Sequence, residues 1–190
     1  MSTQISELSL ELRERMRGVS WHADLPSPSF DELRVLRIPY RDFSGDEQLG
    51  ELITVKALAA EVVDIFAGLF AIDFPIFSMR LMHEFAGDDG DSMAANNSSC
   101  FNSRRIRNTN RISLHALGRA IDINPIQNPV IRDGIVRPDA GKPYCDRSRQ
   151  EPGMFSGTCD ATKVFLSAGW KWGGNWDNPK DYHHFFREAE

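Results

Sequence analysis

The sequence predicts a single α+β domain. The chain has 190 residues, of which 41% are hydrophobic and 10% aromatic, which is enough to bury one core of ordinary size. Apolar residues at helical spacing and short apolar runs typical of strands both occur along it. Neither an internal repeat nor a low-complexity linker separates these patterns. Together they indicate helices and strands that share one core.

The first part of the chain predicts a helix followed by an extended segment. Apolar residues at approximately helical spacing predict a short amphipathic helix over 5–16. The prolines at 26, 28 and 39 then indicate irregular or extended chain. We therefore expect residues 1–38 to form an N-terminal helix with an extended lead-in, and residues 39–190 to form the main globular unit.

The next segments predict the central elements of the core. A wide apolar stripe over 51–70 predicts the main core helix, and Pro75 ends it. Residues 76–82 are typical of a buried strand. The polar residues 87–110 predict a long structured loop of the kind that often carries function.

The last third of the chain alternates between short elements and loops. Residues 119–124 predict a short strand that Pro125 stops, and residues 161–168 predict a helix. Between them, residues 128–157 contain four prolines and are expected to be mostly loop. A stretch rich in aromatic residues closes the chain.

Charge and composition exclude several classes of protein. Lys and Arg number 22 against 27 Asp and Glu, so the net charge is −5, which disfavours nucleic acid or an anionic membrane as a partner. No apolar window is long enough to span a membrane, and residues 1–19 lack the apolar core of a signal peptide. The three cysteines are too few for a disulfide scaffold. Cys145 and Cys159 flank one loop and either pair in an oxidising compartment or are ordinary small residues.

Two segments each contain a histidine and an aspartate a few positions apart. His115 precedes Asp122 by seven residues, and Asp181 precedes His184 by three. Two imidazoles and one carboxylate would give zinc three ligands and leave its fourth position for water. A further carboxylate held close by could take a proton from that water and give it to a leaving amine. The alternative is structural, with His115 capping a strand and Asp122 organising the turn before Pro125.

The sequence motifs in these two segments resemble those of a known family. Ser113-x-His115-x-x-Gly118-x-Ala120-x-Asp122, together with Asp181-x-x-His184-Phe185, is similar to zinc peptidases that include D-alanyl-D-alanine carboxypeptidases, L-alanyl-D-glutamate endopeptidases of phage lysins and vancomycin-resistance D,D-peptidases. The similarity extends through 96–104, 120–125 and 172–174, and spans roughly 39–186. It implies a small antiparallel sheet that carries the zinc site, with helices packed on one side.

The resemblance also assigns roles to individual residues. It implies that His115, Asp122 and His184 bind zinc and that Asp181 is the general base. An arginine in such sites binds the scissile carbonyl and stabilises the oxyanion. Arg104 is our first choice for it, and Arg80 is the runner-up.

The neighbours of these residues have secondary roles. Adjacent strand residues point to opposite faces, so we expect His183 to line the cleft or lie on the surface while His184 faces the metal. Trp172 and Trp176 either form a cleft wall or pack in the core. Ser113 is expected to make a turn hydrogen bond that supports His115.

The predicted function is hydrolysis of a peptide bond in peptidoglycan stem peptides by a zinc-dependent peptidase. The bond is either the one to a terminal D-alanine or the one between L-alanine and D-glutamate. A non-catalytic wall-binding module that contains zinc is the main alternative, and a metal-free structural domain is another. Asp181 favours the enzyme, because a binding module needs no base beside its metal.

The expected place of action is the periplasm or cell wall, reached by phage lysis or by a secretion machine rather than by general export. A catalytic fragment of a longer protein is also consistent with the sequence. A secretion or immunity partner is not identified by any motif.

Overall fold

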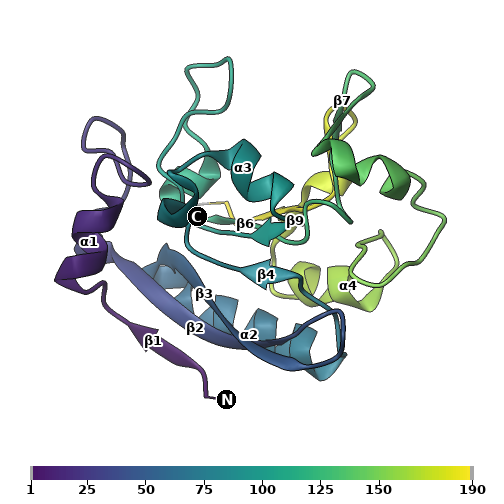
Figure 1. Ribbon diagram of the computed structural model, residues 1–190, viewed down its shortest axis with the longest axis horizontal. Coiled ribbons are helices and arrows are strands. Elements are labelled where there is room, and N and C mark those ends of the chain that lie inside the picture. The colour runs from purple at the N-terminus through teal and green to yellow at the C-terminus, as the bar shows by residue number, and fades with distance from the viewer. Residues whose placement is uncertain (1, 189–190) are drawn as a thin grey trace.

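A computed structural model describes residues 2–188 and has the α+β architecture that the sequence predicts (Figure 1). The strands are β1 (Gln4–Ser6), β2 (Leu33–Arg41), β3 (Glu47–Val55), β4 (Ser78–Met79), β5 (Asn97–Ser98), β6 (Ala120–Asp122), β7 (Val130–Arg132), β8 (Ile135–Arg137), β9 (Lys171–Trp172), β10 (Lys180–Asp181) and β11 (His184–Phe186). The α-helices are α1 (Leu10–Met16), α2 (Ala59–Ala71), α3 (Asp89–Ala94) and α4 (Asp160–Ser167). Short 3-10 helices are η1 (Phe30–Glu32), η2 (Lys56–Leu58), η3 (Met82–Phe85), η4 (Leu114–Leu117), η5 (Asp139–Tyr144) and η6 (Gly173–Asn175).

The largest sheet has the order β1-β2-β3, and α2 packs against it (Figure 1). The prediction of one helix over 51–70 is wrong at its start, because 51–55 belong to β3 and α2 begins at Ala59. Leu52, Ile53 and Thr54 are all buried, so both faces of β3 are covered. A strand covered on both faces shows a continuous apolar run instead of alternation, which periodicity does not distinguish from a helix.

The N-terminal segment also differs in detail from its prediction. Residues 4–6 form β1, and the helix begins only at Leu10, where the Ser9 hydroxyl caps it by accepting a hydrogen bond from the Leu12 amide. The segment predicted as irregular or extended contains the nine-residue strand β2, with Pro39 inside it. β1 pairs only with residues 35–37 of β2, so Pro39 lies where its missing N–H leaves no gap in that pairing.

The middle of the chain contains more structure than predicted. Only Ser78 and Met79 of the predicted strand 76–82 are in a strand, and η3 follows. The expected loop 87–110 contains α3 and β5, and Asp88 caps α3 by accepting from the Asp91 amide. The predicted loop 128–157 contains the β7–β8 hairpin, whose Asp133-Gly134 turn has the positive φ angles that a tight hairpin requires.

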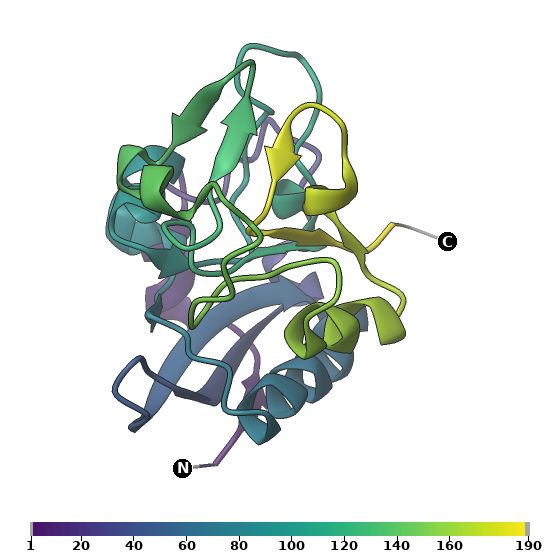
Figure 2. The same ribbon diagram turned by 90° about the vertical axis from the view of Figure 1, so that its right-hand side faces the viewer.

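The predicted strand at 119–124 and helix at 161–168 are confirmed as β6 and α4. β6 lies in a second, antiparallel sheet with the order β6-β11-β9. This is the small antiparallel sheet that the fold prediction requires. Figure 2 shows α2 and α4 side by side on one side of the molecule.

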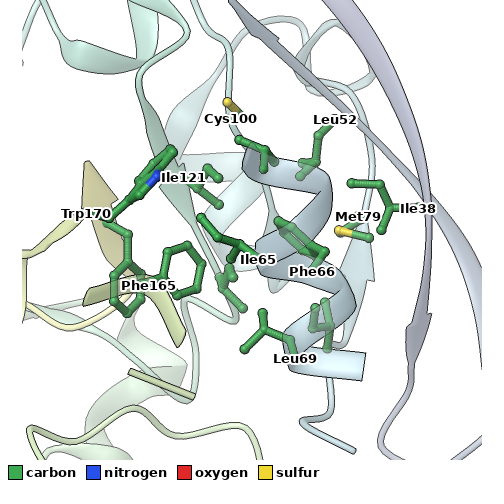
Figure 3. Close-up of a cluster of buried hydrophobic side chains, with 14 of the residues drawn as sticks. Ile38, Leu52, Ile65, Phe66, Leu69, Met79, Cys100, Ile121, Phe165 and Trp170 are labelled. Atoms are coloured by element: carbon green, nitrogen blue, oxygen red, sulfur yellow. The ribbon is translucent and has the colours of Figure 1, made fainter. Parts of the chain in front are cut away.

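One main core joins the two sheets to both of these helices. In Figure 3, α2 presents Ile65, Phe66 and Leu69 between the side chains of the first sheet and Phe165 with Trp170. Phe165 stacks on Phe185 of β11 at a ring-centroid distance of 3.9 Å. The core therefore fixes β11, which carries the predicted ligand His184, against the helical layer. A second apolar cluster lies under the N-terminal segment and includes Leu8, Met16, Phe30, Leu33, Val35, Ile53, Leu81 and Phe101.

Within residues 2–188, no helix is both long and apolar enough to cross a membrane. Cys100, Cys145 and Cys159 are all free thiols. The suggested pairing of Cys145 with Cys159 is therefore not present in this structure.

Candidate metal centre

Two of the predicted ligands lie opposite each other on neighbouring strands. β11 pairs antiparallel with β6, and in this register His184 is the partner of Asp122. Side chains directly opposite on antiparallel strands point to the same face. The sheet thus brings together two residues that are 62 positions apart in the sequence, with His184 Nδ1 2.9 Å from Asp122 Oδ1.

The third predicted ligand, His115, comes from η4, just before β6. Ser113 precedes η4, and its hydroxyl accepts a hydrogen bond from the His115 amide, as the sequence predicts. Gly118 ends η4 at φ +64, and a Cβ there would lie 2.6 Å from the backbone nitrogen of Val55. Only glycine fits this close left-handed turn, which sends the chain from His115 directly into β6.

The three residues form a compact, buried donor set. His115 Nε2 lies 3.1 Å from Asp122 Oδ2 and 3.2 Å from His184 Nδ1. One ligand atom from each residue lies within 4.8 Å of the others, so the set could hold a metal ion. Zinc bound tetrahedrally at its usual bond lengths places its ligands about 3.3 Å apart. Donor types and spacing therefore both fit zinc.

The surroundings of His115 orient it toward this point. Its Nδ1 donates a hydrogen bond to the Cys100 carbonyl, which leaves the lone pair of Nε2 facing Asp122 and His184. A second hydrogen bond that fixes the tautomer is typical of metal-binding histidines. The donor set is thus supported by the backbone around it.

The charges inside the donor set perturb its pKa values. Burial opposes protonation of His115, but the adjacent Asp122 carboxylate outweighs it and raises the pKa of His115. Burial would raise the pKa of Asp122, but the charges of His115 and His183, with hydrogen bonds from His115 and His184, lower it well below its usual range. A buried carboxylate that stays charged is an anchor for a cation.

Asp181 lies close to the donor set, on β10. Its Oδ1 is 3.0 Å from His183 Nε2, and the same nitrogen is 3.8 Å from Asp122 Oδ2. Gly173 packs so closely on this strand that a Cβ there would lie 2.7 Å from the Asp181 carbonyl. Nε2 of His183 therefore lies between the carboxylate of the predicted base Asp181 and that of the predicted ligand Asp122.

Of the two places expected for His183, the surface is wrong, because its side chain is buried. Its Nδ1 donates to the carbonyl of Asn128, at 2.7 Å. Burial opposes protonation of His183, but the charges of Asp181 and Asp122 outweigh it and raise its pKa. His183 lies just before β11, and its ring is enclosed between the Asn128 carbonyl on one side and the carboxylates of Asp181 and Asp122 on the other.

Of the two candidate arginines, Arg104 is the one whose charge acts on the donor set. Its guanidinium contributes to the electrostatic environment of His115, as does Asp89, with which it pairs at 2.9 Å. The Nε of Arg104 is buried and has no hydrogen-bond partner in the described part of the chain. Arg80 instead pairs with Glu84 at 2.7 Å, and no contact joins it to the donor set within residues 2–188.

The tryptophans divide between the two roles considered for them. Trp172 is buried in the main core, and its indole N–H donates to the Tyr182 carbonyl. Trp176 is partly exposed, and its ring lies 5.5 Å from that of His184. Two contacts near the site were not predicted from the sequence, that of Arg104 with Asp89 and that of His183 with Asn128. No local pattern distinguishes Asp89 or Asn128 from other loop residues.

Comparisons with known proteins agree with this geometry. Residues 107–186 match the model of the D-alanyl-D-alanine carboxypeptidase family. The matched region contains His115, Asp122, Asp181 and His184, whereas Arg104 and Arg80 precede it. A search of curated proteins finds no match to the chain, and a search of solved structures finds none either.

Proposed function

We propose that the protein is a zinc-dependent peptidase that hydrolyses a peptide bond in peptidoglycan stem peptides, and the match of residues 107–186 to the D-alanyl-D-alanine carboxypeptidase family model supports this proposal. The observation that carries the proposal is the convergence of His115, Asp122 and His184 on one point. The bond is either that to a terminal D-alanine or that between L-alanine and D-glutamate. Such an enzyme acts where stem peptides occur, in the periplasm or the cell wall.

Each residue has one task in this proposal. His115, Asp122 and His184 would hold a zinc ion through Nε2, a carboxylate oxygen and Nδ1. When bound, zinc polarises the scissile carbonyl and lowers the pKa of water toward neutrality. The carboxylate of Asp181 takes a proton from the attacking water and returns it to the leaving amine. Arg104 holds the carbonyl oxygen while negative charge develops on it.

An exposed basic loop supports an anionic substrate. Arg105, Arg107 and Arg111 lie within seven residues after Arg104 and are exposed, and none pairs with a carboxylate within residues 2–188. This loop and the β7–β8 hairpin project from the same side of the molecule (Figures 1 and 2). Stem peptides carry free carboxylates, which exposed guanidinium groups that no carboxylate neutralises can bind. This charge is local, because the whole chain carries −5.

The function is tested with the purified full chain, loaded with one zinc ion, on defined muropeptides that end in D-alanyl-D-alanine. We expect cleavage that stops after treatment with a chelator and returns when zinc is added. Mass spectrometry of the products distinguishes release of D-alanine from cleavage between L-alanine and D-glutamate. A zinc-loaded protein that binds the wall but cleaves no muropeptide would refute the proposal in favour of the non-catalytic wall-binding module.

The role of Arg104 leads to a separate prediction. We expect Arg104→Ala to lower kcat on the cleaved muropeptide by about 10²–10³-fold, the usual cost of removing one oxyanion donor. Arg15→Ala is the control, because Arg15 lies on α1 and pairs with Glu11 on the surface. Steady-state kinetics of both variants and of Arg80→Ala measure the effect. A larger loss of kcat at Arg80 than at Arg104 would reverse the assignment.

A further inference from the structure

His183 occupies a buried position between the donor set and the predicted base, and it belongs to neither. Its side chain lies just before β11, with 3% of the residue exposed. One ring nitrogen faces the backbone of Asn128, and the other faces Asp181. A buried imidazole with polar partners on both sides is held in one orientation.

The Asn128 contact fixes the ring. A carbonyl oxygen only accepts hydrogen bonds, so Nδ1 of His183 carries a hydrogen and donates it to Asn128 at 2.7 Å. Nε2 is then fixed on the opposite side of the ring, 3.0 Å from Asp181 Oδ1. A hydrogen on Nε2 would let the ring donate to Oδ1 and would leave Asp181 ionised, as its role as the base requires.

Asn128 is itself rigidly held. It is fully buried, and its side-chain oxygen accepts from the Phe155 amide at 2.7 Å and from the Arg147 guanidinium at 2.8 Å. Its side-chain nitrogen donates to the Gly153 carbonyl at 2.8 Å. The loop over 147–155 thus fixes the residue that orients His183.

Asp181 has little other support. It lies on β10, a strand of two residues, and 18% of its side chain is exposed. Its Oδ1 is buried and, within residues 2–188, receives no well-aligned hydrogen bond; His183 Nε2 is close enough to bond but is not aligned for it. The contact with His183 at 3.0 Å is the closest that the Asp181 side chain makes to a charged or ionisable group in the described residues.

We propose that His183 is a positioning residue that holds the Asp181 carboxylate toward the attacking water, with its own orientation set by Asn128. This inference rests on the proposed function, because it assumes that Asp181 is the base. In this arrangement the 147–155 loop holds Asn128, and Asn128 holds the ring of His183. His183 in turn holds the carboxylate that takes the proton from water. Supporting groups of this kind typically change activity by 10–100-fold.

The test compares His183→Leu with His183→Gln in the zinc-loaded full chain. Leu removes the contact, whereas Gln places an amide N–H near the position of Nε2. We expect His183→Leu to lower kcat by about 10–100-fold with KM and zinc affinity unchanged, and His183→Gln to recover most of that loss. In the Asp181→Asn background, His183→Leu should add no further loss, because the two residues act as a unit. His22→Leu is the control.

A second readout does not depend on activity. The ¹³C signal of the Asp181 carboxyl group, identified by its loss in Asp181→Asn, should shift in His183→Leu and return toward its original position in His183→Gln. An unchanged signal, equal losses of kcat in both His183 variants, or a full additional loss in the Asp181→Asn background would overturn the inference. A lowered zinc affinity in His183→Leu would overturn it too, because His183 would then act on the metal site through Asp122 and not on the base alone. If the unmodified chain cleaves no muropeptide, the proposed function fails, and the carboxyl signal still decides whether His183 holds Asp181.

Discussion

Asp181→Asn is expected to lower kcat by about 10²–10⁴-fold while the protein still binds one zinc ion. The amide has nearly the shape of the carboxylate but accepts no proton at neutral pH. Asp181 is not part of the donor set formed by His115, Asp122 and His184, so its replacement leaves all three in place. Kinetics on a defined muropeptide and metal analysis of the same sample measure the two halves of this prediction.

Asp133→Asn provides the matched control, because Asp133 lies in the β7–β8 turn and pairs with Asn178 on the surface. It should keep the kcat of the unmodified enzyme. A normal kcat in Asp181→Asn with full zinc content would show that another group moves the proton. A loss of zinc in that variant would instead show that Asp181 belongs to the metal site.

The sequence predicts those elements best whose signal is local. Helix α4 lies within one residue of its predicted range, and β6 lies inside the predicted strand 119–124. By contrast, β3 resembles the start of a helix, because its two covered faces remove the alternation that marks a strand. The β7–β8 hairpin carries an Asp133-Gly134 signal, but the prolines around it indicate loop more strongly.

The candidate site likewise contains residues that the sequence motifs predict and contacts that they do not predict. The short spacing between His115 and Asp122, and between Asp181 and His184, indicates which residues share a centre before any strand pairing is known. The setting of His183 depends on Asn128, which is 55 residues away, and that of Arg104 depends on Asp89. Neither partner lies in a pattern that periodicity or motif spacing would reveal. Only the folded arrangement of the loops shows these contacts.

His184→Ala is expected to abolish both peptidase activity and the stabilisation of the fold by zinc. In the unmodified protein, zinc at about 100 times its dissociation constant should raise the free energy of unfolding by about 2.7 kcal/mol, because the ion binds the folded state. Removing His184 leaves two protein ligands, His115 and Asp122. Thermal or urea unfolding with and without zinc, together with metal analysis, measures the change. His83→Ala is the control, because His83 lies in η3 and outside the donor set.

The gain from zinc should also depend on pH in a defined direction. Asp122 raises the pKa of His115 in the metal-free fold. Protonated His115 therefore stabilises that fold, and the contribution is complete below the pKa of an unfolded histidine. It is lost as pH rises through the pKa of His115 in the folded protein. Zinc binds only the neutral ring, so it must displace this proton. The stabilisation by zinc should therefore be smaller at about pH 5.5 than at about pH 7.5. A gain that is equal at both pH values, or that persists in His184→Ala, would contradict a centre built on His115, Asp122 and His184.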